Sequence, residues 1–223
     1  DAIASFAADV SHEIKNPLTS LRSAVETISI IKDEKQKKKL MAIALEDINR
    51  LDRLITDISD ASRLDSDLSK DEMINLNLTS LIDGFITIRK EMIKGVKFKL
   101  NLEKDLFISG NESRLIQVFD NLVNNSISFS PKGGEIKIDA LKIRGKIHVI
   151  IPDQGRGIPK GKEDTIFDRF YSDRPSNEKF GKHSGLGLSI VKQILASHKA
   201  AIYADNIYNR NKDIKGAKFT IIF

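Results

Sequence analysis

The sequence predicts an α-helical hairpin over residues 1–67, followed by an α+β two-layer sandwich over residues 68–223. In the first part, apolar residues recur at intervals of three and four along two long segments, which is typical of amphipathic helices. In the second part, short segments of strand type alternate with three further helical segments. Mixed elements in this order indicate a sheet that carries its helices on one face.

The hairpin is predicted from two apolar seams with a charged run between them, residues 32–39. That run indicates a solvated hairpin tip rather than a nucleic-acid-binding patch. Two such helices have too little to bury by themselves, so we expect a homodimer in which two hairpins form a four-helix bundle. The first seam comprises Phe6, Val10, Ile14, Leu18, Leu21, Val25 and Ile28, and the second comprises Leu40, Ile43, Ala44, Ile48, Leu51, Leu54, Ile55, Ile58 and Leu64.

The elements of the sandwich follow from alternation, apolar spacing and turn residues. Thr79 or Ser80 is the expected N-cap of the first helix, and Arg144-Gly145 is the expected turn of a β-hairpin. The predicted strands cover residues 73–78, 96–102, 107–108, 135–143, 146–151, 201–204 and 217–223, and the predicted helices cover residues 80–94, 111–129 and 185–197.

Composition excludes several classes of protein. The chain has no cysteine, which rules out disulfides, thiol catalysis and cysteine-based zinc sites. Its net charge of +5 is spread along the chain and only 6% of residues are aromatic, so we expect no nucleic-acid partner. No run approaches 18 apolar residues, so no membrane span is expected. The lack of a signal peptide and of an initiator Met predicts a cytoplasmic piece of a longer protein.

His12 lies on the polar side of the first helical segment. At about 100° per residue it points roughly 200° away from Val10 and from Ile14, and Asn16 follows one turn later on the same face. Pro17, inside the same helix, removes a backbone hydrogen bond at a cost of about 3 kcal/mol. Because such local conflicts are expected at functional sites, the pattern singles out His12 as a reactive group.

Residues 11–19 (Ser-His-Glu-Ile-Lys-Asn-Pro-Leu-Thr) resemble the H box of sensor histidine kinases of the HisKA type. Residues 50–64 are similar to the second helix of their dimerisation domains. The resemblance implies that His12 is the phosphoacceptor and that Asn16 positions water for dephosphorylation of a response regulator. Glu13 can accept the N–H of the other ring nitrogen, which orients the imidazole and stabilises a developing imidazolium.

Four clusters in the second part resemble the N, G1, F and G2 boxes of the GHKL (Bergerat) ATP-binding fold, in the order of that family. They are residues 121–126, 153–159, 166–171 and 185–188, and residues 167–189 look closest to kinases of the ChvG/ExoS type. Residues 172–184 between the last two boxes are expected to form a flexible lid. The implied nucleotide-binding residues are Asn121, Asn125, Asp153, Gly155, Gly157, Ile158, Tyr171, Gly185, Leu186, Gly187 and Leu188.

The N, G1 and G2 boxes each contain residue types that suit one part of a nucleotide or its metal ion. Asn121 and Asn125 lie one helical turn apart, and amide oxygens suit Mg²⁺; by resemblance Asn125 is the direct metal ligand. Asp153 can accept a hydrogen bond from the adenine amino group, while the glycines that follow let the backbone approach the base. Gly185 and Gly187 open a helix, where free N–H groups favour phosphate.

The chain departs from the family pattern at a few positions. Ser128 stands where Lys or Arg usually faces the phosphates, and Asn111 stands where Asp is common. Residues 198–201 (His-Lys-Ala-Ala) replace a His-Gly-Gly turn, so the helix end loses its glycine cap, and residues 216–217 (Gly-Ala) replace Gly-Thr. None of these changes removes a core catalytic group, so we expect an active enzyme.

The resemblance as a whole implies ATP-dependent phosphorylation of His12 with Mg²⁺, then transfer to an Asp of a response-regulator receiver domain. It further implies the cytoplasmic portion of a bacterial inner-membrane sensor kinase, whose parent protein is membrane-anchored outside this fragment. Two alternatives stay open. One is a GHKL ATPase or ATP-binding module without histidine phosphorylation, and the other is a dimeric signalling scaffold or phosphatase with a degenerate ATP site.

Overall fold

The computed structural model describes residues 2–68, 70–93, 95–131, 133–171 and 185–223. They fall into two compact units. One unit comprises Asp1–Leu64 with Arg169–Gly187, and the other comprises Asp65–Asp168 with Leu188–Phe223.

The first unit contains the predicted helical hairpin up to Leu64, with α1 (Ala2–Ile30) and α2 (Glu34–Leu68) joined by a short turn. Asp33 caps α2, because its Oδ1 accepts hydrogen bonds from the backbone N–H groups of Lys35 and Gln36. α1 continues through Pro17, which is buried. Burial of the proline ring offsets part of the cost of the hydrogen bond that it removes.

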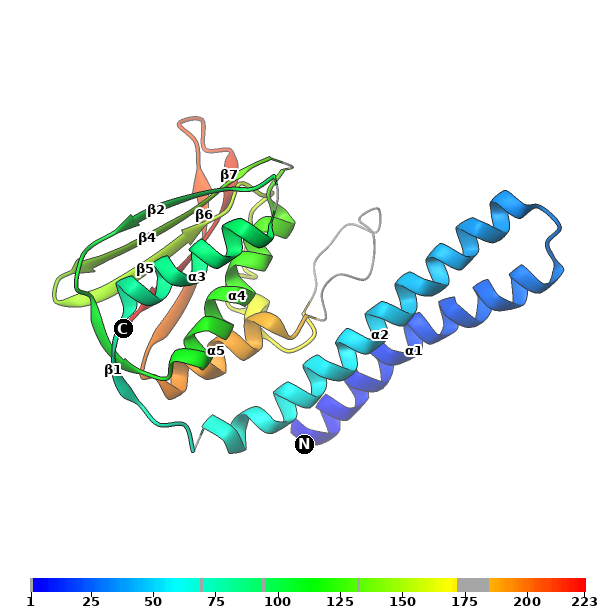
Figure 1. Cartoon of the computed structure of the whole chain (residues 1–223), viewed down its shortest axis with the longest axis horizontal. Coiled ribbons are helices and arrows are strands. Elements are labelled where there is room, and N and C mark those ends of the chain that lie inside the picture. The colour runs from blue at the N-terminus through cyan, green and yellow to red at the C-terminus, as the bar shows by residue number, and fades with distance from the viewer. Residues whose placement is uncertain (1, 69, 94, 132, 172–184) are drawn as a thin grey trace. The chain divides into compact units, whose positions relative to one another are not determined.

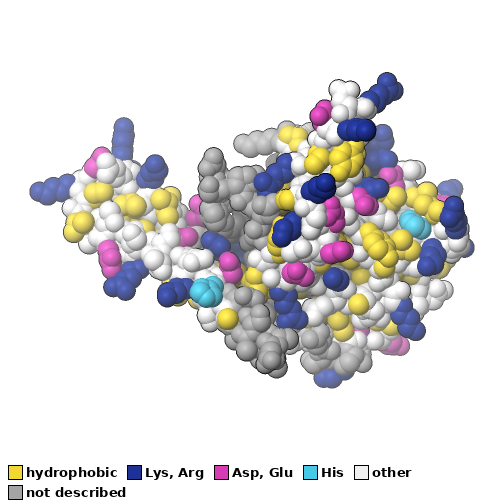
Figure 2. Space-filling view, turned by 180° about the vertical axis from the view of Figure 1, so that it is seen from behind, with side chains coloured by type: hydrophobic (Ala, Val, Ile, Leu, Met, Phe, Trp, Pro, Cys, Tyr) yellow, Lys and Arg dark blue, Asp and Glu magenta, His cyan; other side chains and the backbone are white. Residues whose placement is uncertain are grey.

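The apolar side chains of the hairpin, both inside and outside the two predicted seams, are only partly buried within one chain. Small residues and leucines fill the contact between the two helices, whereas Val25 is 55% exposed and Leu45 is 61% exposed. Figure 2 shows hydrophobic side chains on the surface of the hairpin. Across the described residues, no helix combines the length and the hydropathy needed to cross a bilayer. The buried residues of the hairpin include Pro17, Ala24, Ala44, Leu54, Ala61 and Leu64.

The second unit is built on a five-stranded sheet of order β2-β4-β5-β7-β6, in which β2 and β4 are parallel and the other pairs antiparallel. A separate antiparallel pair, β1 with β3, joins Ile74 to Gly110 at one end. The strands are β1 (Ile74–Asn77), β2 (Lys97–Leu102), β3 (Phe107–Gly110), β4 (Glu135–Ile143), β5 (Lys146–Pro152), β6 (Ala201–Tyr208) and β7 (Ile214–Ile222).

Three helices lie on one face of this sheet, as Figure 1 shows: α3 (Leu78–Met92), α4 (Glu112–Phe129) and α5 (Gly187–Ser197). The core between the two layers alternates along the strands, so that Val149 and Ile151 of β5 point toward the helices. The predicted two-layer α+β arrangement is therefore confirmed. Fully buried members of this core include Ile82, Phe119, Leu122, Val149, Ile151, Ile194 and Ile221.

The ends of several elements differ from the sequence-based expectation; β6, for example, runs to Tyr208, four residues beyond the strand predicted at 201–204. α3 is capped by Asn77, whose side chain accepts the N–H of Ser80, so the helix begins two residues earlier than predicted. α5 begins at Gly187, two residues later than predicted, and ends at Ser197; two residues further on, Lys199 adopts a left-handed φ of 54° without being glycine. The N–H of Ala200 donates to the carbonyl of Leu195, which satisfies that end of the helix.

Candidate functional site

His12 and Asn16 lie exposed on α1, as the helical geometry predicts. Among the described residues, neither side chain makes a hydrogen bond, so both are open to a reactant. Glu13 faces the other helix instead, where its Oε2 lies 3.2 Å from a guanidinium nitrogen of Arg50. This ion pair is partly buried and fixes the carboxylate beside His12, and its α2 partner is a residue that sequence reasoning missed.

Asn121 and Asn125 are half-buried on α4, and their side chains make no hydrogen bonds within the described structure. By contrast, the side-chain amide of the intervening Asn124 donates to Asp120, at 2.9 Å. A turn of helix therefore presents two unengaged amide groups on one face, which can act as ligands.

Asp153 follows β5 and is only 5% exposed. Its Oδ1 accepts the backbone N–H groups of Gly155 at 2.8 Å and of Ala217 at 2.9 Å. In the described structure, Oδ2 accepts no hydrogen bond. Burial raises the pKa of the Asp153 carboxyl, and the hydrogen bonds from Ala217 and Gly155 partly oppose that rise. The result is a buried carboxylate oxygen that can accept a hydrogen bond from a ligand.

The backbone around Asp153 is packed so closely that side chains would not fit. A Cβ on Gly216 would lie 2.1 Å from the Asp153 carbonyl oxygen, and one on Gly155 would lie 2.9 Å from the Cβ of Phe129. Ser130, after α4, accepts the N–H of Gln154 at 3.1 Å. The loop after β5 is thus held against the C-terminal end of the helix that carries Asn121 and Asn125.

Asn206 of β6 is a further residue that the sequence motifs did not indicate. Its side-chain Oδ1 accepts the N–H of Ile158 at 2.6 Å, and its Nδ2 donates to the Ile158 carbonyl at 2.8 Å. The same Oδ1 would lie 2.5 Å from a Cβ on Gly157, whose φ is +80°. The Asn206 side-chain amide therefore pairs with the backbone of Ile158 as a neighbouring strand would. Position 157 requires glycine, because a side chain there would clash with this amide.

The residues of the last two predicted boxes lie at the start of α5 and in the segment before it. Gly187 is the first residue of α5, Leu186 is fully buried, and Leu188 lies in the first turn. A Cβ on Gly185 would lie 2.8 Å from the carbonyl carbon of Phe170, the neighbour of Tyr171. The predicted lid, residues 172–184, lies outside the described residues. Gly185, Gly187 and Tyr171 fall in the unit that includes the hairpin, whereas Asp153 and Asn125 fall in the other.

Comparison with known proteins identifies both parts of the chain. The profile of histidine kinase-, DNA gyrase B-, and HSP90-like ATPases matches residues 110–223. The chain belongs to this ATPase family. A second profile, the His Kinase A (phospho-acceptor) domain, matches residues 2–67, so the chain joins a histidine kinase phosphoacceptor domain to a histidine kinase ATPase domain.

Relatives of the chain are sensor kinases. It is 44% identical to the sensor protein ChvG of Rhizobium meliloti, over 99% of this chain and 40% of that protein. It is 32% identical to the sensor histidine kinase WalK of Bacillus subtilis, over 94% of this chain and 35% of that protein. The chain thus spans about two fifths of the length of the curated relatives that it matches.

Solved structures of histidine kinases share the fold. Histidine kinase ThkA, in complex with response regulator protein TrrA, matches with a TM-score of 0.74 and 27% identity over 98% of this chain and 60% of that chain. A mycobacterial sensor histidine kinase, MprB, matches with a TM-score of 0.57 and 26% identity over 69% of this chain and 96% of that chain. The α+β unit is therefore the ATPase fold of this family.

Proposed function

We propose that this chain is the core of a two-component sensor histidine kinase, with a phosphoacceptor domain over residues 1–67 and an ATP-binding domain over residues 68–223. It transfers the γ-phosphoryl group of ATP to His12, and from there to an Asp of a response-regulator receiver domain. The observation that carries the proposal is the buried Asp153 oxygen in a glycine-lined loop, in the same chain as an exposed histidine on a helical hairpin.

Asp153 binds the adenine base of ATP in this proposal. The adenine amino group donates to Asp153 Oδ2, because Oδ1 is already engaged by Gly155 and Ala217. Because Gly155 and Gly157 have no side chains, the backbone can approach the adenine base closely, and Ile158 contacts the base. The phosphates bind at the start of α5, because a helix N-terminus favours anions; Gly185, Leu186, Gly187 and Leu188 lie there. Tyr171 completes this set of proposed contacts.

Mg²⁺ fits the donor set on α4. Asn121 and Asn125 offer amide oxygens with no competing hydrogen bond in the described structure, and Mg²⁺ takes oxygen ligands together with nucleotide phosphates. Asn125 is the direct ligand in this proposal. The ion, when bound, neutralises charge on the phosphates during transfer.

His12 is the nucleophile. A neutral ring nitrogen forms the N–P bond in line, the bond between the γ-phosphorus and the bridging oxygen breaks, and ADP leaves. Glu13 accepts the N–H of the other ring nitrogen and stabilises the imidazolium that develops. Arg50 keeps Glu13 in place through its ion pair. Asn16, on the same face one turn away, positions water for dephosphorylation of the regulator.

The partners of the chain are a second copy and a receiver domain. Apolar side chains left exposed on the hairpin support a homodimer that closes a four-helix bundle. The match to a kinase that is solved together with a response regulator supports the receiver domain as the acceptor. In this proposal the parent protein is a membrane-anchored bacterial sensor and this chain is its cytoplasmic portion; the names of the relatives support the sensor role.

The test is incubation of the chain with Mg²⁺ and γ-labelled ATP. The proposal predicts a protein-bound label that is lost in acid and survives in alkali, as a phosphoramidate does, and that moves to a receiver domain on addition. ATP hydrolysis without protein labelling would favour the ATPase alternative. No ATP binding at all would favour a dimeric scaffold, for which the replacement at Ser128 is the specific support.

A further inference from the structure

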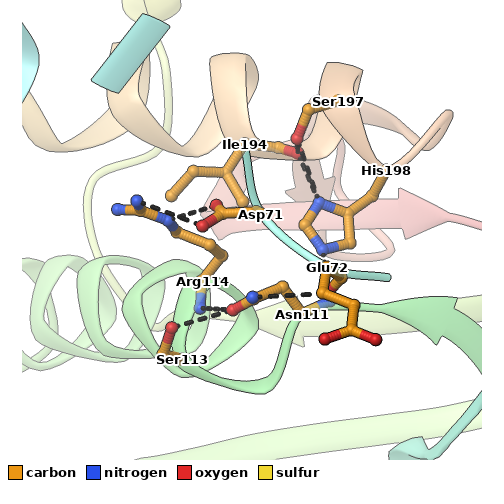
Figure 3. Close-up of polar contacts among 8 residues, drawn as sticks. All are labelled: Asp71, Glu72, Asn111, Ser113, Arg114, Ile194, Ser197 and His198. Carbon is orange, nitrogen blue, oxygen red and sulfur yellow. Dashed lines mark hydrogen bonds and ion pairs between the residues drawn. The ribbon is translucent and has the colours of Figure 1, made fainter. Parts of the chain in front are cut away.

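A polar cluster outside the nucleotide loops joins the segment after α2 to two helices of the ATPase domain (Figure 3). Asp71 lies between α2 and β1, and its carboxylate meets the Arg114 guanidinium of α4 twice, at 2.6 Å and 3.5 Å. Both side chains are largely buried. A bidentate pair of this kind fixes geometry as well as charge, so the segment after α2 is held at one place on α4.

Asn111 is the centre of the cluster. Its Oδ1 caps α4 by accepting the N–H of Arg114 at 3.2 Å, and its Nδ2 points to the Glu72 carbonyl at 3.4 Å. Its backbone N–H donates to Nε2 of His198 at 3.0 Å. One residue therefore contacts the segment after α2, the start of α4 and the end of α5.

His198, just after α5, is held by both ring nitrogens. Nδ1 lies 2.7 Å from the carbonyl oxygen of Ile194, which can only accept, so Nδ1 carries the proton and Nε2 accepts from Asn111. The side chain is only 8% exposed. A Cβ on Gly110 would lie 3.1 Å from the His198 ring. The ring therefore packs against the end of β3, where glycine leaves room for it.

The two helices that meet here carry nucleotide-binding boxes elsewhere along their length. α4 carries Asn121 and Asn125, two to four turns after Asn111. α5 begins at Gly187 and ends against His198. A rigid helix transmits a shift at one end to the other, so a displacement at the cluster moves the residues assigned to Mg²⁺ and phosphate binding.

We propose that Asp71, Asn111, Arg114 and His198 form a polar joint that positions α4 against α5 for ATP and couples the ATP site to the segment leaving α2. The inference rests on the proposed nucleotide site. These four are positioning residues, because in the described structure they act through the two helices.

The test measures the dissociation constant of Mg²⁺–ATP by calorimetry and the rate of labelling at saturating ATP, both on the whole chain. His198→Asn keeps a group near Nδ1 but loses the acceptor for Asn111, and we expect the dissociation constant to rise about tenfold. The labelling rate at saturating ATP should stay within about twofold, since the reacting groups are untouched. His198→Gln, whose amide oxygen reaches the Nε2 position, should restore affinity to within about threefold. His148→Asn, on the other face of the sheet, is the matched control and should leave affinity unchanged.

Asp71→Ala provides a second variant that does not alter the buried ring. It should also raise the dissociation constant about tenfold, whereas Asp205→Ala, which removes a looser and more exposed pair with Lys218, should not. The proposed polar joint would be contradicted if His198→Asn and Asp71→Ala both bound ATP as tightly as the parent chain and differed from it only in a lower unfolding temperature. A parent chain that binds ATP without becoming labelled would instead overturn the proposed function and leave the affinity comparison intact.

Discussion

At the scale of single residues, the proposed ATP site depends on a carboxylate that the fold partly destabilises. Asp153 is buried and its pKa is raised by that burial, so above the raised pKa the ionised group costs the folded state free energy. Below the ordinary pKa of 3.8 the group is protonated in both states and the cost disappears. Ligand recognition thus works against stability at this position.

Asp153→Asn is predicted to raise the free energy of unfolding near neutral pH and to weaken ATP binding by more than about tenfold. The amide oxygen can still accept the two backbone N–H groups, but the Nδ2 group would face the adenine amino donor. Urea unfolding across pH should show the stability gain shrinking as pH falls through the raised pKa of Asp153. A gain that is constant with pH, or undiminished ATP affinity, would contradict the assignment.

Asn125→Ala is predicted to weaken ATP binding about tenfold in Mg²⁺ and far less when the metal is chelated, because the amide acts through the ion. Asn124→Ala is the matched control, since its amide bonds to Asp120 and not to the proposed ligand. Calorimetric titrations with and without Mg²⁺ measure both. Equal losses in the two variants would remove Asn125 as the metal ligand.

The local placement of the motif residues could be predicted, because it depends on neighbours in sequence: Asp153 and its glycines follow one strand, and Asn121 and Asn125 lie one turn apart on one helix. Asn206 could not be predicted, because its partner Ile158 is 48 residues away and nothing in its own neighbourhood signals the contact. The same holds for Arg50, which pairs with Glu13 from 37 residues away. Contacts between side chains that are distant in sequence can be predicted only after the topology of the fold is known.

At the scale of elements, the sequence predicts the helices and strands well and their ends less well. Apolar spacing and alternation depend on burial, which extends along a whole element. Ends depend on capping groups, and several candidates stood side by side before α3, where Asn77 rather than Thr79 or Ser80 caps the helix. The short 3-10 turn Thr165–Phe167 has no periodicity to reveal it.

The C-terminal end of α5 offers a stability prediction. Lys199 occupies the left-handed position that glycine usually fills, at a φ of 54°. Lys199→Gly should stabilise the chain by about 1 kcal/mol, because glycine adopts this conformation without steric cost. Lys215→Gly is the control, on a strand, and should be neutral or destabilising. Denaturant midpoints compare the two, and a loss of stability in Lys199→Gly would contradict the strain argument.

At the scale of the whole molecule, the chain is expected to work as a dimer. Val25 and Leu45 are more than half exposed on the hairpin, and a second hairpin would bury them. The parent chain should therefore elute at twice its mass of 25.0 kDa. Introducing Glu at both positions should give a monomer, because charges would enter the bundle core.

Ile88→Glu is the matched control for that experiment, since Ile88 is 61% exposed on α3 and lies outside the hairpin. Light scattering after gel filtration measures the mass of each variant. A parent chain that is monomeric at micromolar concentration, or a double variant that remains dimeric, would exclude the proposed bundle.

The central claim is that this chain phosphorylates itself on His12, and replacing that imidazole tests it most directly. His12→Gln alters an exposed side chain that makes no hydrogen bond in the described structure, so the fold and ATP binding should be retained. Incubation with γ-labelled ATP should give an acid-labile label on the parent chain and none on His12→Gln. An undiminished acid-labile label on the variant would contradict the account.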